Sequence, residues 1–239
     1  MTKRVVLVRH GDDPPDDRVY TYLRANGFEA DLRRPYQGDS LGEVDDTVCG
    51  TVIYGGPFNA FATQEHPFLK EEYRWIEACL TDDVPMLGIC QGAQQIALHL
   101  GAEVGPKPGE PYEFGYYRVD PTEDGRDFLA RPLWFTQAHY HMFGIPETAV
   151  HLARSEAFEN QAFRYGDKVF GLQFHAEVTP SGFRRWQDDK GADFGKPGAQ
   201  TREEQDDLQA RHDDAQDAWF GGFMTSLFGT AARQAGAAA

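Results

Sequence analysis

The stretch MLGICQGAQQIAL, residues 86–98, joins a short apolar run to a cysteine and then to an amphipathic segment that stops at Gly101. Gly88 and Gly92 flank Cys90 two residues away on each side, which is the cysteine form of the nucleophile elbow, a sharp strand-to-helix turn. Glycine is needed there because the turn leaves no room for Cβ atoms. The thiol would lie at a helix N-terminus, where the helix dipole favours the thiolate. The alternative is a buried cysteine that only packs at a tight turn.

The composition indicates an ordinary globular chain. The 239 residues are 41% hydrophobic and 26% charged, which is enough for a sizeable core. A net charge of −15 argues against attraction to nucleic acid or an anionic membrane, and no apolar run approaches membrane-spanning length. Three cysteines without metal-type spacing are typical of free thiols in a reducing compartment. We therefore expect a cytoplasmic enzyme or binding protein.

Short apolar runs alternate with amphipathic segments in the first hundred residues, which predicts an α/β fold whose mixed, mostly parallel central sheet has helices on both faces. Further short strands between residues 112 and 174 predict an antiparallel section. In the first part, strands are expected over residues 4–9, 28–32, 51–54 and 84–89, and helices near 19–23, over 65–80 and after Cys90.

A change of composition near residue 187 predicts a polar linker and then an acidic helix over residues 201–228. Thr201 and Glu204 have the spacing of a capping box at its start. We expect residues 1–186 to form one domain and residues 187–239 to be a linker and helix packed on it. The apolar positions of this helix are Leu208, Trp219, Phe220, Phe223 and Leu227.

A cysteine nucleophile needs a base, and the stretch GLQFHAE at residues 171–177 offers one. On an extended segment His175 and Glu177 point to the same face, so the carboxylate can orient the imidazole. Both follow an apolar strand, which places them at the sheet edge where Cys90 is also expected. The alternative is a His and a Glu that make only local hydrogen bonds, but the elbow favours the catalytic interpretation.

Acyl transfer also needs donors for the oxyanion that develops on the substrate. The backbone N–H of Gln91, directly after the cysteine, is one such donor. A second is expected in Gly55-Gly56-Pro57, because glycine lets the backbone approach a ligand closely. An ordinary strand-to-loop turn is the alternative there.

Residues 54–57, 88–94 and 171–177 resemble, in this order, the three motifs of class I (triad-type) glutamine amidotransferases. Residues 113–116 and 159–166 also resemble the free-standing subgroup called GMP-synthase-like glutamine amidotransferases. The resemblance covers about residues 4–182 and implies the flavodoxin-like fold of that family, with a C-terminal helix added.

The resemblance also implies roles by position. Cys90 would attack the side-chain amide of glutamine, His175 would transfer protons and Glu177 would orient His175. The backbone N–H groups of Gly56 and Gln91 would hold the oxyanion. The implied substrate-binding positions are Gln94, Gly55, His139, Tyr140 and His141, and no cofactor is implied.

Two departures from the family pattern stand out. Ala176 replaces the proline that usually separates the His and the Glu. At residues 137–143, relatives tend to read W-H-G-D-x-F, whereas here Tyr140 replaces the glycine and His141 the aspartate. This bulkier lining bears on substrate specificity. His139-x-His141 has a second interpretation as a metal pair, but no third ligand stands near in sequence, so we expect no metal.

Three functions follow from these observations. The first is a glutaminase or amidotransferase that releases ammonia from glutamine for an acceptor on a partner synthase, since the chain has no P-loop and no ATP-pyrophosphatase motif of its own. The second is a γ-glutamyl peptidase or hydrolase that uses the same triad on a γ-glutamyl compound. The third is a non-catalytic binding or regulatory module.

Overall fold

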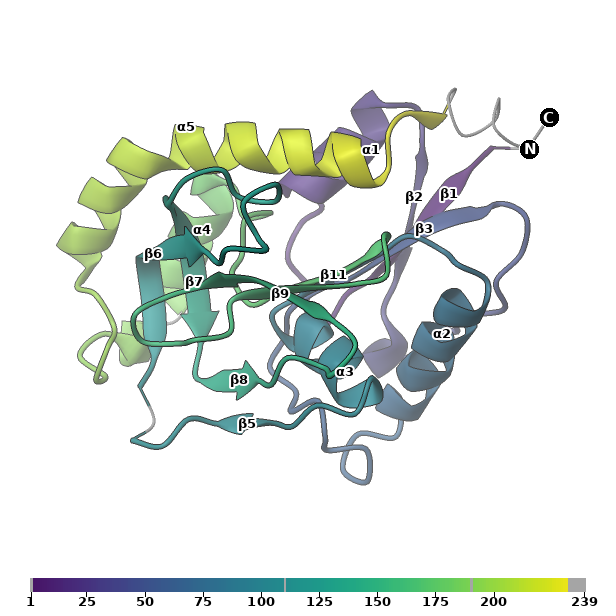
Figure 1. Ribbon diagram of the computed structural model, residues 1–239, viewed down its shortest axis with the longest axis horizontal. Helices are drawn as coiled ribbons and strands as arrows, with labels where there is room; N and C mark the ends of the chain where they lie inside the picture. Colours follow the sequence, from purple (N-terminus) through teal and green to yellow (C-terminus); the bar gives the residue numbers. More distant parts are fainter. Residues whose placement is uncertain (1, 110, 190, 232–239) are drawn as a thin grey trace.

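A single mixed sheet forms the centre of the protein (Figure 1). The computed structural model describes residues 2–109, 111–189 and 191–231, and in these residues nine strands pair in the order β2-β1-β3-β4-β11-β10-β9-β6-β7. The strands are β1 (Arg4–Val8), β2 (Glu29–Arg33), β3 (Val48–Ile53), β4 (Met86–Ile89), β6 (Glu113–Pro121), β7 (Leu133–His139), β9 (Val150–Arg154), β10 (Ala162–Tyr165) and β11 (Val169–Leu172).

The sheet has a parallel half and an antiparallel half. Strands β2, β1, β3, β4 and β11 run parallel to one another, and the remaining four pair antiparallel with their neighbours. The prediction of an α/β fold with a mixed central sheet is therefore confirmed. A separate antiparallel pair, β5 (Val104–Pro106) with β8 (His141–Phe143), was not predicted, because three-residue strands carry almost no periodic signal.

Helices cover both faces of the sheet (Figure 1). Residues of β1 alternate between two cores: Val5 and Leu7 belong to one, whereas Val6 and Val8 belong to the other. The first core includes residues of α1 and α5, and the second those of α2 and α3. The helices are α1 (Arg18–Ala25), α2 (Leu69–Thr81), α3 (Gln91–His99), α4 (Pro180–Asp189) and α5 (Arg202–Leu227), with 3₁₀ turns at Pro35–Gln37 and Gly191–Asp193.

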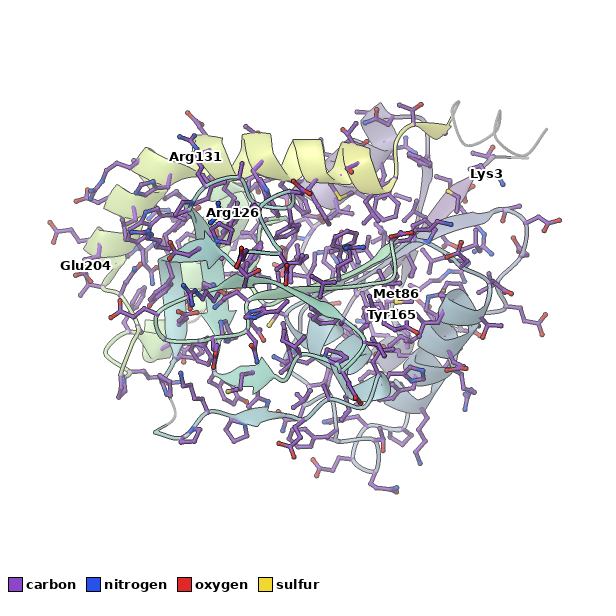
Figure 2. All side chains as sticks on the ribbon, viewed as in Figure 1. Lys3, Met86, Arg126, Arg131, Tyr165 and Glu204 are labelled. Carbon is purple, nitrogen blue, oxygen red and sulfur yellow. The ribbon has the colours of Figure 1, made fainter. Side chains whose placement is uncertain are left out.

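Three element boundaries differ from the sequence-based expectations. Helix α2 begins at Leu69, four residues late, because Pro67 restricts the residue before it to extended conformations. Strand β3 already begins at Val48, so Cys49 lies within the strand. Strand β11 ends at Leu172, so the residues that follow it are in turns. Met86 and Tyr165, both labelled in Figure 2, pack in the core beside α2 and α3.

Helix α5 lies along the sheet and α1 (Figure 1). Its start has the predicted capping box, in which Thr201 Oγ1 accepts from the Glu204 N–H at 3.2 Å and Glu204 Oε2 accepts from the Thr201 N–H at 2.8 Å. Further along, Phe220 is buried in the core and Gln216 Oε1 accepts the Thr136 N–H of β7 at 2.8 Å.

The domain division at residue 186 stays a prediction. No helix among the described residues has the length and hydropathy needed to cross a membrane.

Truncation of the α5 contact face should destabilise the protein. Phe220 is 1% exposed, so Phe220→Ala is expected to lower the free energy of unfolding by about 3–5 kcal/mol through lost burial and a residual cavity. Urea unfolding followed by circular dichroism measures this change. Phe61→Ala is the matched control, because Phe61 is 46% exposed and its loss should leave the midpoint nearly unchanged. Equal midpoints for both variants would contradict the assigned packing.

Candidate active site

Three loops meet at the carboxyl edge of the parallel half of the sheet. Strand β4 pairs with β3 on one side and with β11 on the other, with Ile53 opposite Gly88 and Leu172 opposite Ile89. The Cys90 N–H then donates to the Leu172 carbonyl at 2.7 Å. The residues that follow β3, β4 and β11 are therefore neighbours in space, as the sequence predicts for this edge.

Cys90 occupies a strained turn between β4 and α3. Its φ is 50° and its ψ −108°, a conformation that costs a non-glycine residue roughly 1–3 kcal/mol. The flanking glycines allow close contact, since a Cβ on Gly92 would lie 2.0 Å from the Ile53 carbonyl oxygen and one on Gly88 would lie 2.7 Å from the backbone of residues 92–93. This is the geometry expected of a nucleophile elbow.

His175 and Glu177 lie beside Cys90 and are both buried. The His175 Nδ1 is 2.8 Å from Glu177 Oε1, and the edge of the ring faces the Trp186 ring at a centroid distance of 4.8 Å. The expected extended segment is absent, because β11 ends before them. Instead the His175 N–H donates to Thr136 in β7, and the Glu177 carbonyl accepts the N–H of Arg18, both at 2.8 Å. Two backbone hydrogen bonds thus fix the pair.

The electrostatics of His175 favour the imidazolium. Burial acts to lower its pKa, but the charge of Glu177, the interaction with the Cys90 sulfur and hydrogen bonds to both outweigh burial and raise the pKa from 6.5 to about 10. His175 is therefore protonated at neutral pH, between the thiol sulfur and the carboxylate. With Nδ1 bonded to Glu177, Nε2 is the nitrogen left to face Cys90.

The Gly55-Gly56 segment runs directly beside this pair. A Cβ on Gly55 would lie 2.8 Å from His175 Cε1 and 3.2 Å from Cys90 Cβ, so only glycine fits without displacing the side chains of His175 and Cys90. The segment is tied to α3 through Gln91, whose Oε1 accepts the Phe58 N–H at 3.0 Å. Gln91 is also the first residue of α3, so its own N–H has no partner within the helix.

The predicted substrate positions Gln94 and His139 are buried and engaged with other protein groups. Gln94 Nε2 donates to Gln173 Oε1 at 3.2 Å. His139 Nε2 is 3.0 Å from Glu113 Oε2, and His139 Nδ1 is 3.0 Å from the His141 carbonyl. Both ring nitrogens of His139 therefore already have hydrogen-bond partners. Neither nitrogen is left to ligate a metal ion together with His141, which was the alternative interpretation of this pair.

The remaining predicted positions of this loop differ in exposure. Tyr140 is 47% exposed and its ring centroid is 4.4 Å from that of His141. Burial and the charge of His139 lower the pKa of His141 below 6.5, so His141 is neutral at neutral pH. The loop 139–141 therefore presents the aromatic rings of Tyr140 and His141, and His141 contributes no positive charge.

A cavity of about 440 Å³ opens next to Cys90. Of the predicted site residues, Cys90, His175, Glu177, Gly55 and Gly56 line it, whereas Gln94, Gln91 and the loop 139–141 do not. Two ion pairs form part of its wall: Arg9 Nη1 is 2.8 Å from Asp17 Oδ2, and Arg185 Nη2 is 2.7 Å from Asp16 Oδ1.

Sequence reasoning missed this wall and also His10, which borders the same cavity. Asp17 carried one usable signal, because it precedes a helix and caps it by accepting the Tyr20 N–H at 3.0 Å. Its Oδ1 also accepts the Tyr54 hydroxyl at 2.8 Å, and burial raises its pKa although Arg9 acts to lower it. Arg9 and Arg185 belong to no local pattern that points to a site.

Comparison with known proteins identifies the family of this chain. The family model "Glutamine amidotransferase class-I" matches residues 17–186. The glutamine amidotransferase-like protein YfeJ of Salmonella typhimurium is 34% identical over 74% of this chain and 76% of its own length. One of the subunits of the glutamine-hydrolyzing GMP synthase of Ignicoccus hospitalis is 35% identical over 64% of this chain and 77% of its own length.

Solved structures give the same result. A glutamine amidotransferase from Thermotoga maritima superposes with a TM-score of 0.85 at 28% identity and covers 95% of this chain and 99% of its own. The fold, the arrangement of the loops at the carboxyl edge of the sheet and the sequence together define an α/β protein of the amidotransferase type. The chain belongs to the class I glutamine amidotransferase family, so the suspected resemblance is confirmed.

Removal of the Glu177 charge should lower the pKa of His175. The negative charge of Glu177 favours the imidazolium, so in Glu177→Gln the ring is expected to lose its proton at a lower pH than the wild-type value of about 10. NMR titration of the labelled histidine ring measures this shift. The raised pKa stabilises the folded wild type fully below the ordinary value of 6.5, and the gain is lost as the pH rises through about 10. An unchanged His175 titration in the variant would refute the assigned contact.

A methyl group at Gly55 should disrupt the site without unfolding the protein. Gly55→Ala places a Cβ 2.8 Å from His175 Cε1 and 3.2 Å from Cys90 Cβ, so the ring must shift and the His175–Cys90 geometry is disturbed. We expect the rate of Cys90 alkylation by iodoacetamide near neutral pH to fall about tenfold or more as the charge pair loosens. Gly222→Ala in α5, where a Cβ meets nothing within 4 Å, is the control. Equal alkylation rates in both variants and in the wild type would argue against the geometry.

Proposed function

We propose that this protein is a glutaminase of the amidotransferase type that hydrolyses the side-chain amide of glutamine through a thioester on Cys90 and releases ammonia. The observation that carries the proposal is the buried Cys90–His175–Glu177 arrangement, with the cysteine in a strained elbow and the pKa of His175 raised to about 10. A protonated imidazole beside a thiol favours the thiolate, which is the reactive form.

Each half of the reaction, acylation and then hydrolysis, moves one proton through His175. The Cys90 thiolate attacks the amide carbon, and the carbonyl oxygen takes the negative charge between the N–H groups of Gly56 and Gln91. The His175 imidazolium then protonates the amide nitrogen as the C–N bond breaks and ammonia leaves. Neutral His175 next takes a proton from water, whose oxygen adds to the thioester, and glutamate leaves as the thiolate reforms. Glu177 holds the ring through Nδ1 in every step.

For substrate recognition we propose that Gly55 shapes one side of the pocket directly. We further propose that Gln94 and the loop 139–141, which lie outside the cavity lining, act on substrate specificity through their neighbours, since Ala138 beside the loop does line the cavity. Tyr112 lies beside the loop. Burial raises the pKa of Tyr112, and the charge of Asp193 and the hydrogen bond to its carboxyl group raise it further. Its ring centroid is 6.2 Å from that of Tyr140.

The ammonia acceptor is proposed to reside on a partner synthase. One relative is by its name part of a glutamine-hydrolysing GMP synthase, which is a statement about that protein. For this chain, the proposal rests on family membership and on the lack of a P-loop in its sequence. We further propose a cytoplasmic enzyme that works without cofactor, nucleic acid or membrane, in which residues 187–239 form a linker and helix packed on a domain of residues 1–186.

A γ-glutamyl hydrolase is the second candidate, and the cavity favours it. A volume of about 440 Å³ beside Cys90 falls within the range of ligand pockets and is far larger than departing ammonia requires. The same thioester route would then release a larger amine from a γ-glutamyl compound. A non-catalytic module is the third candidate, which the assay below also tests.

Activity should depend on the Cys90 thiol alone. Wild type and Cys49→Ala are expected to release ammonia from glutamine at similar rates, because Cys49 lies in β3 at the opposite end from the carboxyl edge. Cys90→Ala should lose activity by about 10⁴-fold or more, as for other enzymes without their nucleophile. Coupled ammonia detection measures this loss, with amine release from γ-glutamyl peptides assayed in parallel.

The outcomes separate the three functions. Turnover of γ-glutamyl peptides without turnover of glutamine would replace the first function by the second. Equal inactivity of wild type and Cys90→Ala toward both substrates, with a thiol that resists iodoacetamide, would contradict both enzymatic functions and leave the non-catalytic module.

A further inference from the structure

A third buried His–Glu pair, besides His175–Glu177 and His139–Glu113, lies on the other side of the Gly55-Gly56 segment. His10 follows the end of β1 by two residues, and Glu72 belongs to α2. Both side chains are 0% exposed, and His10 Nε2 is 3.0 Å from Glu72 Oε2. The triad does not include this pair, and fully buried ionisable groups are rare unless they are paired. The pair therefore invites a functional explanation.

The hydrogen bonds of His10 fix one of its protons. Its Nδ1 is 3.1 Å from the carbonyl oxygen of Tyr54, and a carbonyl oxygen can only accept, so Nδ1 donates. Its Nε2 faces the carboxyl group of Glu72, which also accepts from Gln95 Nε2 at 2.6 Å. One carboxyl group thus connects His10, beyond the end of β1, to both α2 and α3.

The two histidines enclose the two glycines. A Cβ on Gly56 would lie 2.3 Å from His10 Cβ, whereas a Cβ on Gly55 would lie 2.8 Å from His175 Cε1. The segment is also held at both ends, because His10 binds the Tyr54 carbonyl and Gln91 Oε1 accepts the Phe58 N–H. The Gly55–Gly56 peptide carries the N–H proposed to hold the oxyanion. Glycine peptides rotate readily, so an external constraint is needed to fix this one.

We propose that His10, held by Glu72, is a positioning residue that fixes the Gly56 N–H in its oxyanion-binding orientation. His10 acts through the Tyr54 carbonyl and through contact with Gly56, and it touches no reacting atom. The inference rests on the proposed function, because an oxyanion donor matters only if Cys90 attacks an acyl group. Loss of one oxyanion donor lowers kcat by about 10²–10³-fold, which sets the upper limit of the effect.

The kinetic test compares wild type, His10→Ala and His10→Gln, with His99→Ala as the control. His99 is a suitable control because it pairs with Glu77 at the surface, away from the cavity. His10→Ala should lower kcat for glutamine about 10- to 100-fold with KM nearly unchanged. Alkylation of Cys90 by iodoacetamide should stay at the wild-type rate, since that reaction forms no oxyanion. His10→Gln should recover part of kcat, because its amide N–H can donate to the Tyr54 carbonyl.

Two kinetic results would overturn the proposal. One is an unchanged kcat in His10→Ala. The other is an equal fall in kcat and in the alkylation rate, which would mean that the Cys90–His175 pair itself is damaged. His10→Ala leaves the buried Glu72 without its histidine partner, which could destabilise the fold. The double variant His10→Ala/Glu72→Gln is therefore measured as well. If it folds, we expect the same changes in kcat, KM and alkylation rate as for His10→Ala.

Hydrogen exchange provides a test that does not need turnover. In His10→Ala the backbone amides of residues 54–56 and 58 should exchange faster than in the wild type, and in His99→Ala they should not. An unchanged exchange rate in a folded His10 variant overturns the positioning role whatever the activity. A wild type that hydrolyses neither glutamine nor γ-glutamyl peptides would instead refute the proposed function, while the exchange result still decides whether His10 holds the segment.

Discussion

The parallel pairing of β4 with β3 and β11 is the constraint on which the site depends. Each strand is short, and its register with its neighbours places the carboxyl ends of all three strands next to one another at one edge of the sheet. The Cys90 N–H extends the β4–β11 ladder by one hydrogen bond to Leu172, which anchors the strained turn. A register shift of one residue would reverse the facing of the side chains and separate Cys90 from His175. The chemistry is therefore set by backbone hydrogen bonds before any side chain is considered.

Two buried His–Glu pairs then flank one flexible segment in different ways. Glu177 binds Nδ1 of His175 and leaves Nε2 toward the thiol, whereas Glu72 binds Nε2 of His10 and leaves Nδ1 toward a backbone carbonyl. The first arrangement holds an imidazole nitrogen next to the Cys90 sulfur. The second provides a fixed donor next to the backbone. A histidine and a glutamate thus serve charge stabilisation at His175 and conformational restraint at His10. The difference arises because the ring nitrogen that does not bind the glutamate meets the Cys90 sulfur in the first pair and a backbone carbonyl in the second.

Sequence patterns predicted the parts of this protein that depend on local spacing. The elbow around Cys90, the His175-x-Glu177 pair and the glycines at 55–56 each lie within a few residues, and their strand context predicted one edge. His10 and Glu72 are 62 positions apart and meet only in the folded chain, so no periodicity could reveal them. The end of β11 was also missed, because burial alone does not distinguish Phe174 in a turn from Phe174 in a strand. The cavity wall formed by Arg9, Asp17 and Arg185 was missed for the same long-range reason.

The most direct test of the central claim is to trap the acyl-enzyme. The wild-type protein is mixed with glutamine, quenched in acid within the turnover time and analysed by intact and peptide mass spectrometry. The account predicts a mass increase of one γ-glutamyl group on the peptide that contains Cys90. Turnover without any adduct at Cys90, or with an adduct at Cys49 or Cys79, would contradict it.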